Sequence, residues 1–178
     1  MSELKIFKVH PEVSLPGYAT TGSACFDLSY QPHGKTHAEG YDRVNRPFTR
    51  NIDSKIGKLT IAGGERMLVP TGLIFDLPEG HSLRLHPRSG LSLKKGITLI
   101  NAEGVVDEDY YHETFILLWN TTDINFDLVP GDRIAQAELC PSEQLKFLES
   151  KERPEQKTDR AGGFGSTDSA PKKTKKSA

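Results

Sequence analysis

The sequence predicts an all-β protein with one short helix and a flexible C-terminal arm. Short alternating or β-rich runs are separated by Gly, Pro, Asn and Asp, which is typical of a β-sandwich or β-barrel. Long amphipathic stretches are absent, and 35% hydrophobic content in 178 residues suits one modest core. We therefore expect a folded domain over residues 1–150 and an arm over residues 151–178.

Each expected strand is a short run of β-forming residues bounded by turn residues. In chain order the runs are Lys5–Val9, Ala24–Leu28, Lys58–Ile61, Arg66–Val69, Leu73–Leu77, Ser82–His86, Ile97–Ile100, Thr114–Trp119, Phe126–Leu128, Arg133–Leu139 and Leu145–Leu148.

One helical turn is expected at Ser89–Lys95. Ser89 can cap the first N–H groups, while Lys94 and Lys95 stand near the negative end of the helix. Gly96 then ends the helix, because glycine readily adopts the left-handed conformation of a C-terminal cap.

Residues 31–57 are polar and irregular, and they are expected to form a long surface insertion. The breaks in periodicity come from Pro32, Gly34, Gly40 and Pro47. A mixture of basic and aromatic residues leaves open a contact with a protein or nucleic acid, beside the simpler interpretation of a solvated loop: Arg43, Arg46, Arg50, Tyr41 and Phe48.

A zinc site is disfavoured at the two histidines of this insertion. His33 and His37 have the spacing of metal ligands on a helix, but Pro32 and Gly34 oppose the helix that would align them.

Composition bounds the partners and the compartment. The formal net charge is −1 and the pI is about 6.6, so no overall charge recruits nucleic acid or an acidic membrane. The segment Met1–Val9 lacks the apolar stretch of a signal peptide, and no run approaches the length of a membrane-spanning helix. We expect an intracellular, cytoplasmic protein in which Cys25 and Cys140 are buried thiols rather than a disulfide.

The arm carries a glycine-rich segment, Arg160–Thr167 (RAGGFGST). Its glycines let backbone N–H groups turn toward an anion, and its hydroxyls and guanidinium add donors. Phe164 is the one side chain able to cover a flat ring. Taken alone, the composition also fits an ordinary disordered terminus.

Asp107 is the candidate general base of the chain. It follows an apolar run in Asn101–Tyr110, which is expected to form a β-hairpin with a partly desolvated carboxylate. An ordinary acidic turn is the alternative. Pro87–Gly90 brings a guanidinium, a hydroxyl and helix-start N–H groups together, as an anion site requires, and Gly131–Gln136 opens a strand with a charged pair.

Together, five segments resemble the five motifs of trimeric dUTP pyrophosphatases (dUTPases). They are Tyr18–Leu28, Pro87–Gly90, Gly104–Tyr110, Gly131–Gln136 and Arg160–Thr167. The resemblance implies a distorted jelly roll, a homotrimer with shared active sites, and Mg²⁺-dependent hydrolysis of dUTP to dUMP and pyrophosphate. Such an activity keeps dUTP low and supplies dUMP for dTMP synthesis.

The resemblance also implies a role for each motif residue. Asp107 would activate the water that attacks the α-phosphorus, while Asn101, Gly104 and Val106 read the uracil and Tyr110 packs under the deoxyribose. The phosphate contacts would come from Arg88, Ser89, Gly90 and Gln136, with Arg160, Gly165, Ser166 and Thr167 closing over the γ-phosphate and Phe164 stacking on the base. Asp27 would pair with Arg133 or hold metal-bound water, and Mg²⁺ would be gripped by the triphosphate and waters without a direct protein ligand.

Three departures from the motifs stand out. Cys25 replaces a usual glycine, Tyr111 and His112 follow the hairpin tyrosine, and Asp168 adds a negative charge beside the lid. Two other functions remain open: a dCTP deaminase of the same fold, and a dUTP-sensing regulatory protein that works through residues 31–57.

Overall fold

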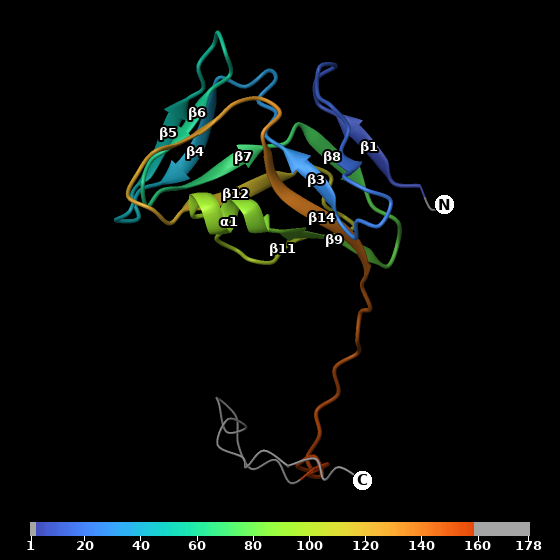
Figure 1. The fold of residues 1–178 in the computed structure, drawn as a ribbon. Helices are drawn as coiled ribbons and strands as arrows, with labels where there is room; N and C mark the ends of the chain where they lie inside the picture. The colour runs from blue at the N-terminus through green and yellow to red at the C-terminus, as the bar shows by residue number, and fades with distance from the viewer. Residues whose placement is uncertain (1–2, 159–178) are drawn as a thin grey trace, which may run out of the picture. The chain divides into compact units, whose positions relative to one another are not determined.

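The computed structural model describes residues 3–158 and confirms the all-β class, with strands arranged in the jelly-roll fold (Figure 1). Two five-stranded sheets have the orders β10-β12-β7-β4-β5 and β11-β9-β14-β3-β2, and two-stranded sheets pair β1 with β8 and β13 with β6. The elements are β1 (Lys5–Lys8), β2 (Gly17–Tyr18), β3 (Phe26–Ser29), β4 (His37–Tyr41), β5 (Pro47–Asn51), β6 (Leu59–Ile61), β7 (Arg66–Pro70), β8 (Leu73–Asp76), β9 (His81–His86), α1 (Ser89–Lys95), β10 (Ile97–Leu99), β11 (Gly104–Val106), β12 (Phe115–Asn120), β13 (Phe126–Leu128) and β14 (Arg133–Pro141).

The core is one apolar cluster, made of side chains from alternating strand positions in both large sheets. Met67 and Val69 of β7 and Ile116 and Leu118 of β12 have no exposed surface, while Leu68 between them faces outward. This alternation follows from the pleat of a strand, whose successive side chains point to opposite faces.

The expected helix forms as α1, and its C-terminus is as expected. Gly96 takes a left-handed conformation (φ 63°, ψ 26°), and backbone N–H groups at this cap donate to the carbonyls of Leu91 and Ser92. The N-terminus differs, because the capping position is Arg88 in an extended conformation and no side chain caps the first N–H groups. The expectation that Ser89 caps the helix is therefore wrong.

The expectation of an irregular insertion over residues 31–57 is also wrong. Here β4 and β5 form an antiparallel hairpin, and β4 pairs with β7, so the insertion extends a five-stranded sheet. The inward positions of β4 are Ala38 and Gly40, whose small size hides the usual apolar alternation of a half-buried strand. Pro47 begins β5 at the sheet edge, where a missing N–H group is tolerated.

Asp42 closes the tip of this hairpin. Its carboxylate accepts hydrogen bonds from the backbone N–H groups of Val44 (2.9 Å) and Arg46 (2.8 Å). Asn45 takes a left-handed conformation (φ 64°), which asparagine adopts more readily than most residues.

Several basic and aromatic side chains of the insertion hold the hairpin in place. Arg50 forms a bidentate ion pair with the buried Glu65 and lies 4.8 Å from the ring centre of Phe48. Tyr41 receives the guanidinium of Arg66 over its ring at 4.9 Å. These contacts give Arg50, Phe48 and Tyr41 structural roles.

Two further expectations need correction. Residues 101–110 do not form their own hairpin: β11 pairs with β9, and a turn follows in which Tyr110 N–H donates to the Asp107 carbonyl. Residues 145–148 contain no strand, and Leu145 and Phe147 are exposed. Their apolar pattern lacks a neighbouring strand to pair with, which periodicity alone cannot reveal.

The chain divides into two units, residues 1–144 and 145–178. The first carries every helix and strand found between residues 3 and 158, and the described part of the second, residues 145–158, contains none. The only helix in the described range, α1, has seven residues and is too short to span a bilayer.

Gly40 offers a test of how tightly the insertion packs. A Cβ at this position would lie 2.6 Å from the Arg66 carbonyl oxygen and 2.8 Å from Cγ of Met67, closer than real contacts allow. We expect Gly40→Ala to lower the free energy of unfolding by about 1–3 kcal/mol, measured by denaturant titration. Gly22→Ala, where a Cβ meets nothing within 4 Å, should change it by less than about 0.5 kcal/mol.

Candidate functional site

The expected anion-binding residues line one cavity of about 530 Å³. Asp27 comes from β3, Arg88 and the start of α1 from the end of β9, and Arg133 and Gln136 from β14. The structure thus brings three of the five sequence motifs together. Lys94 and Lys95 also line the cavity. From the sequence, these two lysines were expected only to stabilise the C-terminus of the helix.

Asp27 ties the two arginines of this cavity together. Its Oδ1 accepts a hydrogen bond from Nε of Arg88 at 2.8 Å, and its Oδ2 accepts one from a terminal nitrogen of Arg133 at 3.0 Å. The carboxylate is largely buried, with 16% of its side chain exposed. Because each guanidinium carries five N–H donors, both keep donors for a ligand.

A β-bulge in β14 places Arg133 and Gln136 on the same face of the sheet. Between Arg133 and Ala135 the pairing with β3 shifts by one residue, so Ile134 and Ala135 are both buried. Without the extra residue, positions 133 and 136 would point to opposite faces. Gln136 then donates from its side-chain amide to the Pro87 carbonyl at 3.0 Å, which fixes the segment that leads to Arg88.

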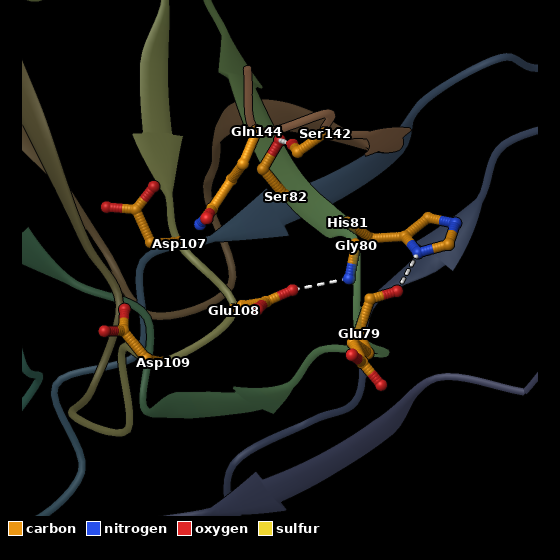
Figure 2. Close-up of a pocket in the computed structure, with 9 residues that line it drawn as sticks. All are labelled: Glu79, Gly80, His81, Ser82, Asp107, Glu108, Asp109, Ser142 and Gln144. Carbon is orange, nitrogen blue, oxygen red and sulfur yellow. Dashed lines mark hydrogen bonds between the residues drawn. The ribbon is translucent and has the colours of Figure 1, made fainter. Parts of the chain in front are cut away.

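Asp107 lies in a different cavity, of about 560 Å³. Figure 2 shows Asp107 and Asp109 on one side of it, with Glu108 reaching across to the Gly80 backbone N–H. Gln144 also lines this cavity. Asp107 is exposed in the single chain, so the expected partial desolvation of its carboxylate is not present here.

The expected uracil-reading residues lie along β11, which is an edge strand of its sheet. Gly104 is opposite Leu85, and a Cβ at Gly104 would lie 3.0 Å from the Leu85 side chain. Val106 is buried in the core, so only its backbone can face a ligand. Asn101 is exposed, and Tyr110 is 40% exposed with its hydroxyl donating to the Glu113 carbonyl at 3.1 Å.

The two cavities lie at opposite ends of the paired strands β9 and β14. Ser82 and Ser142 share a hydrogen bond of 2.7 Å at the Asp107 cavity, while Pro87 and Gln136 meet at the arginine cavity. The six residue steps from Ser82 to Arg88 span roughly 20 Å in extended conformation. One chain therefore keeps its candidate base far from its candidate phosphate-binding residues.

The structure shows the surroundings of two residues that depart from the family motifs, Cys25 and His112. Cys25 lines the arginine cavity as a free, half-buried thiol; burial, and then the negative charge of Glu138, raises the pKa of this thiol. Cys140 is also free and half-buried, so neither cysteine is as fully buried as expected. His112 packs against Tyr110 edge to face, with ring centres 5.7 Å apart.

The glycine-rich lid lies outside the described residues. The expected contacts that fall there are Arg160, Phe164, Gly165, Ser166 and Thr167, together with the departure Asp168.

The fold and the arginine cavity define a jelly-roll protein with a candidate anion-binding site at the end of two strands. Residues 51–168 match the family model described as dUTPase. The chain belongs to the dUTPase family, which confirms the resemblance of its motifs.

Curated relatives and solved structures agree with this assignment. The chain is 39% identical over 156 residues to a deoxyuridine 5'-triphosphate nucleotidohydrolase of Roseobacter denitrificans, covering 87% of each chain. A relative of that name from Rhizobium rhizogenes is 39% identical over 155 residues, covering 87% of this chain and 85% of the relative.

Among solved structures, a dUTPase from Streptococcus mutans is 26% identical with a TM-score of 0.61, covering 82% of this chain and all of that one. A Staphylococcus bacteriophage 80alpha dUTPase is 16% identical with a TM-score of 0.72, covering 94% and 99%, and this likeness shows the fold alone.

The Asp27 bridge gives a direct test of the arginine cavity. Asp27→Asn removes the negative charge that both guanidinium groups face, so we expect a loss of about 1–3 kcal/mol in the free energy of unfolding. The matched control is Asp76→Asn, because Asp76 meets Lys5 at 3.9 Å with both side chains exposed. That change should stay within about 0.5 kcal/mol, and an equal effect of the two variants would contradict the bridge.

Proposed function

We propose that this protein hydrolyses dUTP to dUMP and pyrophosphate, which keeps dUTP low and supplies dUMP for dTMP synthesis. The observation that carries the proposal is the cavity in which Asp27 holds Arg88 and Arg133 beside Gln136. Family membership and the names of the relatives support dUTP as the substrate.

The reaction we propose is an in-line attack of water on the α-phosphorus. Asp107 accepts a proton from the water as its oxygen bonds to phosphorus, and the bond from the α-phosphorus to the bridging oxygen breaks. Pyrophosphate leaves with that oxygen and its electron pair. An exposed carboxylate next to an edge strand is accessible to both substrate and water.

Arg88, Ser89, Gly90 and Gln136 would hold the phosphate oxygens, since charge-assisted donors stabilise the charge that develops on them. Asn101 and the unpaired edge of β11 from Gly104 to Val106 would read the uracil, and Tyr110 would pack under the deoxyribose. The lid residues Arg160, Phe164, Gly165, Ser166 and Thr167 would close the site.

Mg²⁺ is expected to bind through the triphosphate and waters. The donor set of the arginine cavity supports this, because its carboxylate, Asp27, already accepts from two guanidinium groups and the other charged lining residues are cationic. When bound, the ion supplies charge neutralisation on the phosphate oxygens.

The separation of the two cavities supports a homotrimer with shared active sites. Asp107 and Arg88 lie at opposite ends of β9, too far apart to act on one α-phosphate. A neighbouring subunit that brings its Asp107 end against the Arg88 end of the first would complete the site, and threefold closure would complete three of them.

Asp107→Asn tests the general base. We expect kcat for dUTP to fall about 10²- to 10⁴-fold with dUTP affinity and Tm nearly unchanged, because the side chain is exposed and holds no part of the core. Asp109→Asn, an exposed carboxylate lining the same cavity, is the control and should keep activity within about threefold. Near-wild-type turnover of Asp107→Asn would remove this residue from the mechanism.

Mixed trimers test the shared site. Arg88→Ala and Asp107→Asn should each be nearly inactive alone, and refolding them together at equal amounts should restore about a quarter of wild-type activity through sites with one intact half from each subunit. If both residues act from the same subunit, mixing restores nothing.

The substrate itself is tested by incubating the protein with dUTP, dCTP and the other deoxynucleoside triphosphates. Pyrophosphate from dUTP alone is expected. Ammonia from dCTP without pyrophosphate from dUTP would instead indicate the deaminase.

A further inference from the structure

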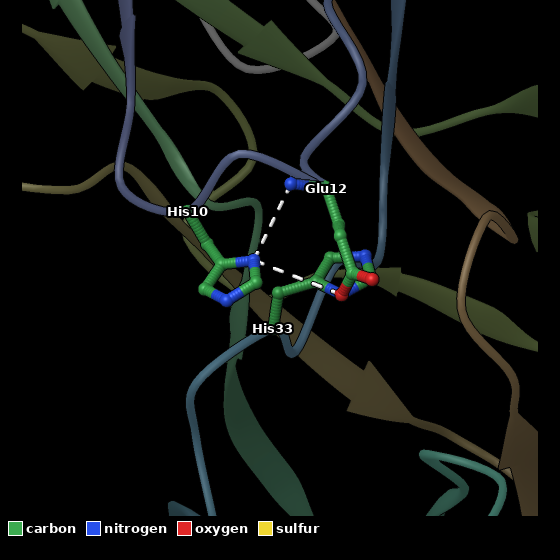
Figure 3. A group of neighbouring side chains, drawn as sticks. All are labelled: His10, Glu12 and His33. Carbon is green, nitrogen blue, oxygen red and sulfur yellow. Dashed lines mark hydrogen bonds and ion pairs between the residues drawn. The ribbon is translucent and has the colours of Figure 1, made fainter.

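We propose that His10, Glu12 and His33 form a binding site for a divalent transition metal of the zinc class. His10 and Glu12 lie in the loop after β1, and His33 lies in the segment after β3, at the start of the insertion (Figure 3). The proposal is independent of the proposed hydrolysis, because none of these residues lines the arginine cavity or the Asp107 cavity.

The three ligand atoms lie close to the spacing that such an ion requires. Nδ1 of His33 lies 3.3 Å and Nδ1 of His10 lies 3.8 Å from the same carboxylate oxygen of Glu12, and the possible ligand atoms all lie within 4.8 Å of one another. Bonds of about 2.0–2.1 Å in tetrahedral geometry place neighbouring ligand atoms about 3.3 Å apart. Two imidazoles and one carboxylate are a ligand set that zinc commonly takes.

The histidine rings are held ready to bind. They stack with their centres 5.7 Å apart and their planes 10° from parallel, and Nδ1 of both rings lies near the Glu12 carboxylate. In the absence of an ion, Nδ1 of His10 accepts a hydrogen bond of 3.3 Å from the Glu12 backbone N–H. The metal would replace this weak hydrogen bond at Nδ1 of His10, which the same ring atom's distance of 3.8 Å from the Glu12 carboxylate allows.

Buried Gln31 fixes the two loops that carry the ligands. Its side-chain amide donates to the carbonyls of Ser14 (3.0 Å) and Thr71 (3.1 Å), and its carbonyl accepts from the Ser14 backbone N–H. The Val13 backbone N–H also donates to the His10 carbonyl at 3.0 Å. Because both loops are anchored beside the cluster, little conformational entropy is lost when an ion binds.

The side chain of Glu12 is 71% exposed, so the fourth coordination position faces solvent. We infer a site with three protein ligands and one water that fastens the loop after β1 to the base of the β4–β5 hairpin. His33 thus belongs to a metal site with partners distant in sequence, rather than with His37.

A second cluster, Cys25, His86 and Glu138, is less suited to a metal. Both ring nitrogens of His86 face carboxylates, Nε2 at 3.1 Å from Glu138 and Nδ1 at 3.6 Å from Glu103. Burial and the charge of Glu138 raise the pKa of the Cys25 thiol, which disfavours the thiolate that would bind the ion.

The test is a calorimetric titration of the metal-free full-length protein with Zn²⁺, in the absence of nucleotide. We expect one site whose affinity falls at least about tenfold in His33→Ala and in Glu12→Gln, with binding unchanged in the control His37→Ala. Zn²⁺ at 100-fold above its Kd should raise Tm by about 5–10 °C in the wild type and less in the two ligand variants. Glu12→Gln changes an exposed side chain, so it tests the site even if His33→Ala folds poorly.

Cobalt(II) separates the two clusters, because a thiolate ligand gives a charge-transfer band that imidazole and carboxylate do not. A tetrahedral cobalt spectrum without this band supports the site at His10. Undetectable zinc binding, affinity unchanged by both ligand variants, or a thiolate band lost in Cys25→Ser would overturn the proposal.

Discussion

The arginine cavity depends on one carboxylate. Arg88 precedes α1 and Arg133 begins β14, and without a negative charge between them their guanidinium groups would repel each other in a partly buried site. Asp27 offsets that repulsion while leaving one positive charge in excess and several N–H donors free. The bulge at Ile134 and the Gln136 contact to Pro87 both serve this arrangement, because they set where the two arginines stand.

The same sheet separates the candidate phosphate-binding residues from the candidate base. β9 and β14 lie side by side in Figure 1 and carry one group of polar residues at each end. Under the proposed mechanism, a monomer would hold two incomplete halves of the active site. Assembly would join unlike halves from different subunits, so the proposed catalysis would depend on subunit association.

Much of the fold was predictable from local patterns. Turn residues and β-rich runs indicated most strands, and Gly96 correctly marked the end of α1. The β4–β5 hairpin was missed because Ala38 and Gly40 fill its inward positions; the turn residues Asp42 and Asn45 are the local signal that was overlooked. The segment 145–148 was assigned wrongly because its apolar residues have no pairing partner, a tertiary property.

The candidate site was predictable through its motifs and less so through its geometry. The residue types at Arg88 and Asp107 indicated an anion site and a base. Their separation depends on strand register, which the sequence does not encode locally. The cluster of His10, Glu12 and His33 joins positions far apart in the chain, so spacing along the sequence did not reveal it.

The paired strands between the two cavities have a consequence for how this chain can change. Their length sets the distance between the cavities. A single residue added within His81–His86 would move Arg88 by about 3.3 Å and turn every later side chain of the strand to the other face. The Asp42–Arg46 tip of the insertion has no such constraint, since it ends a hairpin at the sheet edge. We therefore expect changes in length to be tolerated at that tip and to disturb the two cavities when they fall within β9 or β14.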